Sequence, residues 1–527
     1  MAILIVLGAF LFRLPALPDR PMHTDEAVHA VKLGTLLEHG EYVYDPHEYH
    51  GPVIYYLTLP VLWAQDIGTL ADVPDETPLR LPIALTGALL AGAVMLAWRD
   101  LGFLQALVAA LLLATSPAFV FYSRYYIQEV PFVGAMFLAF AAAWKAFRPG
   151  SHGGWALAAG VFLGVSMALK ETWLVMIGAG VLAAVLLHCR DHGLVRSLQF
   201  DTWVSRKRLI RFAVLVVVAF VTGAALLSNF LRHPQAVPDL FRSLASYVLR
   251  GVTGDSSTFG AGIHDHPWYY YFELLIWPQV EGPWRWSEGF TLVLGLVGLL
   301  SALQKRHLGA TPWPFIGVTT ILLTIVYCGL PYKTPWNMLP MFLGWTLLAG
   351  QGAAVLWAHA RHPALRGVVG LTVTAWVGLL AVQSYRANIV RPADARNPYS
   401  YSASSTSVLR LAERARQLAA VSPQGNRMLI QIISSANDYW PLPWYLRQFP
   451  NIGYYTDTQQ LLPGAALVLC ADHVTETEST DLGTSVETRL PEHQVEYYGL
   501  RPEVILTTMI APDLWQAFMK TRTEPAP

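Results

Sequence analysis

The sequence has few charged residues and few cysteines for its length. Only 14% of its 527 residues are Asp, Glu, Lys or Arg, against roughly 25% in soluble domains. The formal charges cancel to zero at pH 7, so nothing in the composition attracts nucleic acid and we expect no nucleic-acid partner. Cys189, Cys328 and Cys470 lie far apart, which argues against a disulfide framework, and no CxxC metal motif is present.

Apolar and aromatic residues are abundant instead. They reach 54% of the chain, with 18 Trp and 23 Tyr, residue types that concentrate at membrane–water interfaces. A membrane-spanning helix needs about 20 mainly apolar residues. We therefore predict a polytopic α-helical membrane protein with about eleven spans. The predicted spans are 1–17, 81–98, 103–121, 131–147, 155–169, 172–188, 211–230, 289–304, 313–330, 337–357 and 366–385.

The distribution of positive charge predicts the orientation of these spans. Alternate loops carry repeated Lys and Arg, most densely at 206–211, whereas the loops between them carry mostly single cations. Cytoplasmic loops are enriched in Lys and Arg, which places the N-terminus inside. The short apolar segment 53–63 is assigned to the membrane interface, because counting it as a span would reverse every later loop. The loops 19–80 and 231–288 are then the outer loops of the membrane domain, residues 1–385.

The composition changes after the last predicted span. Residues 386–402 form a polar linker, and residues 403–527 resemble a soluble domain on the outer, extracytoplasmic side. An amphipathic segment at 407–420 predicts a helix, and 438–448 predicts a second one. Strands are predicted at 428–433, 466–470 and 504–508. We expect a small α/β or α+β domain, without a GxGxxG, P-loop or GxSxG motif.

A pair of acids follows the first predicted span. Thr24 is predicted to cap a helix whose first turn holds Asp25 and Glu26, where the helix dipole favours negative charge. An apolar stripe after them predicts a short helix lying along the membrane surface. The simplest interpretation of such a pair alone is a capped surface helix. The interpretation as a site depends on other polar residues that the predicted topology places on the same face.

Single polar residues stand at the outer ends of several predicted spans. Arg124 and Glu129 lie between two spans, Lys170 lies in a tight turn, and Lys333 lies in a proline-rich loop. Glu129 alone is typical of an acid that complements a helix dipole, and the lysines alone are typical of side chains that extend to the interface. Both lysines are also flexible point charges suited to a phosphate.

The second outer loop carries a possible metal motif and a possible lid. His264, Asp265 and His266 offer common metal ligands, so a divalent metal is one hypothesis. The other is a surface loop that ends in an aromatic interface belt around Tyr269. The Gly-, Ser- and Thr-rich segment 251–262 is a candidate lid that orders when substrate binds.

These motifs together resemble the GT-C membrane glycosyltransferases. The residues that carry the resemblance are Asp25-Glu26, the stretch 50–56 that begins with His50, Glu129, Lys170, 266–271, and Lys333 with Leu339-Pro340. The resemblance covers about residues 1–385 and points to the protein O-mannosyltransferase and aminoarabinose-transferase-like group. The stretch 332–336 is similar to the flippase-associated Agl-type subgroup. This sequence departs from the relatives at Glu171, where they usually have glycine.

The resemblance implies a hexosyl or pentosyl transferase in the plasma membrane. A polyprenyl-phosphate-linked sugar would be the donor, and a protein, lipid or polysaccharide would accept the sugar on the outer face. Asp25 would be the general base, and Glu26 and Glu129 would orient it, bind the acceptor or raise its pKa. Lys170, Lys333 and Arg124 would face the phosphate. His50, His266 and Tyr269 are further candidates for substrate binding, and His264 with His266 for a metal.

Two other classes of function fit parts of the sequence. A lipid-linked sugar flippase or transporter usually shows internal repeats and broken helices near the middle of the bilayer, whereas the charged residues here stand at the ends of spans. A non-catalytic relative or a scaffold for the C-terminal domain leaves the outer-face carboxylates without a purpose.

Overall fold

A computed structural model gives the fold of residues 1–527. It describes the whole chain except residues 47–49, 194–204, 254–263, 277–285, 305–310, 395, 436–437, 475–478 and 524–527. Among the described residues, six helical segments are long and apolar enough to cross a membrane. They are Thr77–Leu96 (α4), Glu129–Ala146 (α8), Trp173–His192 (α10), Arg206–Leu227 (α12), Pro335–His359, which contains α17 (Leu339–His359), and Pro363–Val390, which contains α18 (Pro363–Tyr385).

Shorter apolar helices complete the bundle. They are α1 (Ala2–Arg13), α3 (Val53–Trp63), α6 (Phe103–Thr115), α9 (Gly154–Met167), α15 (Gly289–Ala302) and α16 (Trp313–Gly329). Each predicted span overlaps one of these twelve apolar helical segments, and α3 is the segment assigned to the interface. The prediction of a polytopic helical membrane protein is confirmed. The number of crossings stays a prediction, because half of these segments are shorter than a typical span.

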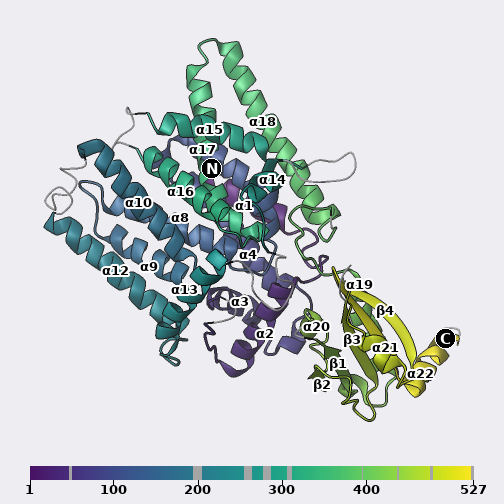
Figure 1. Ribbon diagram of the computed structural model, residues 1–527. Coiled ribbons are helices and arrows are strands. Elements are labelled where there is room, and N and C mark those ends of the chain that lie inside the picture. The colour runs from purple at the N-terminus through teal and green to yellow at the C-terminus, as the bar shows by residue number, and fades with distance from the viewer. Residues whose placement is uncertain are drawn as a thin grey trace.

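Glycines allow the central helices to pack closely. A Cβ on Gly298 of α15 would lie 1.9 Å from the carbonyl oxygen of Leu348 in α17, and a Cβ on Gly352 would lie 1.9 Å from that of Leu294. Only glycine permits such an approach, as at small-residue interfaces between membrane helices. The apolar window of α17 is 78% buried, whereas that of α18 is 6% buried. Thus α17 lies at the centre of the bundle and α18 at its periphery (Figure 1).

The predicted site residues gather at one end of the bundle, which we call the α2 end. It contains the helix α2 (Thr24–His39), the first residues of α4, α8 and α17, and the last residues of α1 and α9. The opposite end is held by its own ion pairs, in which Asp100 accepts from Arg148 at 2.7 Å and lies 3.5 Å from Lys145. The predicted site residues and the ion pairs of Asp100 thus lie at different ends of the bundle.

The C-terminal residues form a five-stranded sheet in the order β2-β1-β3-β5-β4. Its strands are β1 (Ile430–Ser434), β2 (Ile452–Tyr455), β3 (Leu467–His473), β4 (Gln494–Arg501) and β5 (Val504–Ile510). The first three are parallel and the last two are antiparallel to their neighbours. The three predicted strands are present, whereas β2 and β4 were not predicted. The predicted mixed domain is confirmed.

Helices flank the sheet and connect it to the bundle. The predicted helix 407–420 is α19 (Ser407–Val421), and α21 (Leu482–Glu487) and α22 (Pro512–Thr523) follow later in the chain. The helix predicted at 438–448 was too long, because only α20 (Leu442–Tyr445) is helical and a cis Trp440–Pro441 bond precedes it. Figure 1 shows α20 beside α2, so the sheet domain sits at the α2 end.

Candidate active site

The start of α2 presents two adjacent acids in opposite environments. The helix begins at Thr24, but its cap is His23 rather than the predicted Thr24. The His23 ring accepts from the Asp25 amide at 3.1 Å, and the Glu26 carboxylate accepts from the His23 amide at 2.9 Å. These reciprocal bonds form a capping box. They fix the first turn of α2 and therefore the direction of both acids.

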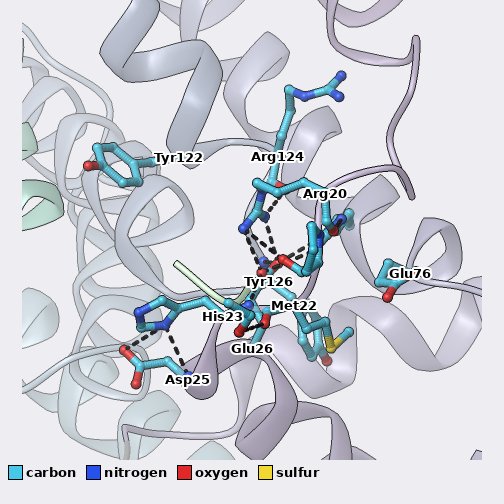
Figure 2. A network of polar contacts seen from close by, with 12 residues as sticks. Arg20, Met22, His23, Asp25, Glu26, Glu76, Tyr122, Arg124 and Tyr126 are labelled. Carbon is cyan, nitrogen blue, oxygen red and sulfur yellow. Dashed lines mark hydrogen bonds and ion pairs between the residues drawn. The ribbon is translucent and has the colours of Figure 1, made fainter. Parts of the chain in front are cut away.

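Glu26 points into the protein, where donors surround it (Figure 2). Its side chain is fully buried and pairs with Arg20 at 3.0 Å and with Arg80 at 2.9 Å. The amide of Tyr126 donates to it as well, at 2.8 Å. Burial alone would raise the pKa of this carboxyl, but the two guanidinium groups outweigh burial and lower the pKa to about 2. Glu26 is thus an anchor for the loop before α2 that is charged at neutral pH.

Asp25 points away from that anchor. Its side chain is 34% exposed, and its carboxylate lies 3.9 Å from the Nδ1 atom of His23. Burial lowers the pKa of His23, so the imidazole is neutral near pH 7. The His23 ring also meets the edge of Trp336, with 5.4 Å between ring centroids. Asp25 therefore has an accessible carboxylate beside the packed rings of His23 and Trp336.

Lys170 and Glu129 form a second charged group at the α2 end. The Lys170 ammonium donates to Glu129 Oε1 at 2.6 Å and to Asn337 Oδ1 at 2.8 Å. Glu129 is the first residue of α8, and Asn337 precedes α17. The second carboxylate oxygen of Glu129 is buried and has no hydrogen-bond partner among the residues that the structure describes. Asn337 follows Trp336 directly, so the loop before α17 connects Lys170 and Glu129 with the ring of His23 beside Asp25.

His50 and Glu171 form a third charged group. Glu171 follows Lys170 in the turn, and its carboxylate lies 2.5 Å from His50 Nδ1 and accepts from the Tyr44 hydroxyl at 2.7 Å. Burial opposes its ionisation, but His50 and Tyr44 favour it and the net effect lowers the pKa of Glu171. Gly51 packs so closely that a Cβ would lie 2.2 Å from the Ala168 carbonyl oxygen. Glu171 thus helps to fix the loop around His50.

Lys333 lies at the α2 end, where the backbone of residues 331–333 pairs with that of residues 264–266. The amide of Lys333 donates to the His264 carbonyl at 2.8 Å, and the amide of His266 donates to the Pro331 carbonyl at 3.1 Å. The Lys333 ammonium donates to the His266 carbonyl at 2.8 Å and also to the Leu330 carbonyl. Burial lowers the pKa of this lysine. The predicted residues His264, His266 and Lys333 are therefore brought together.

Aromatic residues, Tyr270 among them, contact the two histidines of this group, whereas the predicted Tyr269 lies at the surface. The His266 ring stacks on Tyr270 with 4.0 Å between centroids and an interplanar angle of 3°. Tyr269 is 48% exposed beside Trp268, which is 67% exposed. His264 contacts the Tyr401 hydroxyl at 2.8 Å. Tyr269 thus belongs to the exposed aromatic belt, and Tyr270 supports the imidazole.

Backbone carbonyl oxygens surround the guanidinium of Arg124. Its guanidinium donates to the carbonyl oxygens of Arg13 at 2.5 Å, Pro15 at 2.7 Å, Ala16 at 2.9 Å and Asn388 at 3.3 Å. These bonds engage both terminal nitrogens. The structure therefore places Arg124 at the end of α1, where both terminal nitrogens bond to backbone carbonyl oxygens, and its role toward the donor phosphate stays a prediction.

The predicted outer loop 231–288 gave two hypotheses, a metal site and a lid. Among the described residues, no group of three or more His, Cys, Asp or Glu side chains is placed to hold a metal ion. His264 and His266 supply two of the ligands that a metal would need, and Asp265 between them forms a backbone bridge with Tyr332. Most of the candidate lid, residues 254–262 of 251–262, lies outside the described residues.

Several residues of the site were not predicted from the sequence. They are Arg20, Arg80, Glu171, Tyr270, Trp336 and Asn337. Arg80 had a usable signal, because an arginine in the first turn of an apolar helix needs an anion. Trp336 and Asn337 lie inside the loop that drew attention to Lys333. A rule that examined every polar or aromatic neighbour of a predicted site residue would have found them.

Comparison with known proteins relates this geometry to a class of enzymes. Residues 58–221 match the model of the dolichyl-phosphate-mannose-protein mannosyltransferase family. That segment includes Glu129 and Lys170 but begins after Asp25. No curated protein matches the chain by sequence.

Solved structures match over nearly the whole chain. ArnT from Cupriavidus metallidurans in the apo state is 16% identical with a TM-score of 0.63, over 97% of this chain and 98% of that one. The same protein bound to undecaprenyl phosphate is 15% identical with a TM-score of 0.60, over 96% and 97%. The archaeal oligosaccharyltransferase AglB from Archaeoglobus fulgidus, in complex with an inhibitory peptide and a dolichol-phosphate, is 12% identical with a TM-score of 0.51, over 89% and 69%.

The chain therefore has the fold of ArnT along nearly its whole length. The match of residues 58–221 and the shared fold bear out the predicted class of enzyme, the membrane glycosyltransferases that use a polyprenyl-phosphate sugar donor.

Proposed function

We propose that this protein transfers a sugar from a polyprenyl-phosphate carrier to an acceptor on the extracytoplasmic face of the cell membrane, with Asp25 as the general base. One observation carries the assignment of the base. Of the three predicted acids, Glu26 is held by two arginines and Glu129 by Lys170, whereas the Asp25 side chain is 34% exposed. A base must reach the proton that it removes, and Asp25 is the acid with that access.

The reaction follows from this arrangement. The acceptor hydroxyl or amine attacks the anomeric carbon of the donor, its proton passes to Asp25, and the bond between that carbon and the phosphate oxygen breaks. The polyprenyl phosphate leaves with the electron pair and needs cations near it. Lys170 and Lys333 would supply them, with His50 and His266 beside them. ArnT bound to undecaprenyl phosphate and AglB bound to dolichol-phosphate support a carrier of this kind.

The acceptor is proposed to be a protein, lipid or polysaccharide. The flippase-associated Agl-type subgroup remains the proposed affiliation, supported by the convergence of Trp336 and Lys333 on the site. The membrane domain would be residues 1–385 with eleven spans, followed by the linker 386–402 and an extracytoplasmic domain at 403–527. The gathering of the predicted site residues at the α2 end supports this orientation.

The decisive test is Asp25→Asn. The amide keeps the shape of the carboxylate but cannot take the proton, so the transfer rate should fall roughly 10²- to 10⁴-fold. The assay measures release of polyprenyl phosphate from a panel of polyprenyl-phosphate sugars by the purified protein. Asp513→Asn, in the exposed first turn of α22, is the matched control.

Two results would contradict the proposal. Near-normal transfer by folded Asp25→Asn protein would exclude Asp25 as the base. If transfer also survived Glu26→Gln and Glu129→Gln, a flippase or transporter would be the better interpretation.

A further inference from the structure

The backbone just before the acids is held by the C-terminal domain. The Met22 amide donates to the Tyr445 hydroxyl at 2.7 Å, and the Met22 carbonyl accepts from the Ser404 hydroxyl at 2.6 Å. Met22 is fully buried. It directly precedes His23, the cap of α2, and lies three residues before Asp25. Both main-chain groups of Met22 are thus fixed by residues more than 380 positions away in the sequence.

From this contact we propose that the C-terminal domain is a positioning part of the active centre, in which Tyr445 and Glu76 hold the backbone that presents Asp25. The inference rests on the proposed function, because it concerns the placement of the proposed base. It assigns no chemical step to the domain. A base held to within a fraction of an ångström is effective, and a displacement of about 1 Å can reduce a rate about 100-fold.

Glu76 ties this contact to the helical bundle. The Tyr445 hydroxyl donates to Glu76 Oε1 at 3.0 Å while it accepts from Met22, and the Trp444 indole donates to the same oxygen at 3.0 Å. Glu76 is the residue before α4 and is 5% exposed. Arg447 adds bonds to the carbonyls of Val73 at 2.6 Å and Pro74 at 3.1 Å. The short helix α20 is therefore fastened to the start of α4.

The other side of the same segment is held by α4 itself. Arg80 lies one turn after Glu76 and donates to the carbonyls of Leu17 at 2.8 Å and Arg20 at 2.9 Å, as well as to Glu26. The segment 17–26 is thus bound by Arg80 of α4 and by Tyr445 of α20. These buried bonds stop at Glu26 and leave Asp25 accessible. They therefore set the position of Asp25 without covering it.

Loss of the Tyr445 contacts with Met22 and Glu76 should lower kcat more than it weakens binding of the donor. Tyr445→Phe leaves the Met22 amide and a buried Glu76 oxygen short of a partner, so the segment before Asp25 can shift. The donor phosphate would be bound by Lys170 and Lys333, which belong to other elements. We therefore expect kcat to fall about ten- to 100-fold, with little change in donor affinity or in the KM for the acceptor.

The experiment compares two identical substitutions in one domain. Tyr445→Phe is measured beside Tyr497→Phe on β4, whose side chain is 64% exposed. Both are assayed in the full chain for kcat, for the KM of donor and acceptor, and for thermal unfolding. A lower kcat in folded Tyr445→Phe, with unchanged KM and a normal Tyr497→Phe, supports the inference. An unchanged kcat in Tyr445→Phe, or a rise in acceptor KM alone, overturns it.

A second pair decides the matter if Tyr445→Phe does not fold. Glu76→Gln keeps the oxygen that accepts from Tyr445 and Trp444 and should retain most of kcat, whereas Glu76→Ala should lose it. Equal kcat in these two variants overturns the inference. Asp25→Asn separates the two proposals, because an active Asp25→Asn removes the proposed base itself. An inactive Asp25→Asn with a normal Tyr445→Phe removes only the positioning role.

Discussion

Glu26→Gln should damage stability, whereas Asp25→Asn should damage catalysis. The two acids are adjacent in the chain, and each change replaces a carboxylate with an amide of nearly the same shape. In Glu26→Gln, the buried guanidinium groups of Arg20 and Arg80 lose their shared counter-charge. The new amide group also brings N–H donors to a place where Arg20, Arg80 and the Tyr126 amide already donate.

The size of the effect can be worked out in two ways. Removing one partner of a buried ion pair typically costs about 3–5 kcal/mol, because the other charge stays buried without compensation. The pKa of Glu26 is about 2 against an ordinary value of 4.5, and this difference corresponds to about 3 kcal/mol of stability at neutral pH. Both routes give a loss of about 3 kcal/mol or more. Asp25 is partly exposed, so its replacement should change stability by less than about 1 kcal/mol.

The assay is thermal or denaturant unfolding of the purified protein in detergent, beside sugar transfer measured at a temperature where each variant is folded. Glu26→Gln should show a clearly lower unfolding midpoint. Asp25→Asn should show a nearly normal midpoint with transfer reduced roughly 10²- to 10⁴-fold. A normal midpoint in Glu26→Gln would refute the anchor role. A midpoint equally lowered in Asp25→Asn would show that both acids are structural.

Three further predictions concern pH, the phosphate site and topology. Because the pKa of Glu26 is lowered in the folded state, the ionised carboxylate stabilises the fold above pH 4.5, and this stabilisation is lost as the pH falls towards 2. The unfolding midpoint of the wild type should therefore fall over this range more steeply than that of Glu26→Gln. Parallel curves for the two proteins would contradict the role of Glu26 as a charged anchor. Lys333→Ala should weaken binding of the polyprenyl-phosphate donor and Lys333→Arg should restore it in part, since a guanidinium presents its donors as a planar fork; unchanged donor affinity in Lys333→Ala would remove this lysine from the site. Cysteines introduced near residues 205 and 450 should label from opposite faces of the membrane, with 205 inside, and labelling from one face would refute the eleven-span arrangement.

The sequence predicted the elements with continuous apolar runs better than those that mix polar and apolar residues. The apolar helices were found because each places a long run of apolar residues in the chain. In the sheet, the three predicted strands are β1, β3 and β5, the inner strands of the order β2-β1-β3-β5-β4. The two missed strands are both edges. Edge strands are partly exposed and lack a continuous apolar run, as the pattern of β4 shows.

The candidate site was predicted in its location but not in its internal contacts. Helix geometry implies that adjacent residues such as Asp25 and Glu26 point in different directions, but it does not say which one turns inward. That choice depends on Arg20 and Arg80, and Arg80 lies 54 residues further along the chain than Glu26. Arg124 illustrates the opposite case. It was proposed to face the phosphate because it is a cation in a predicted outer loop, and nothing in the sequence indicated that the carbonyls at the end of α1 would surround it.

The charged residues of the α2 end have partners before any substrate arrives, and this determines how a phosphate could bind. The Lys170 ammonium has three N–H groups, of which one meets Glu129 and one meets Asn337. The Lys333 ammonium has two of its three on backbone carbonyls. A buried lysine without such contacts would lose its charge through desolvation. On the proposed function, the phosphate therefore adds a further acceptor to lysines that are already held in place, and donor binding requires no ion pair to break.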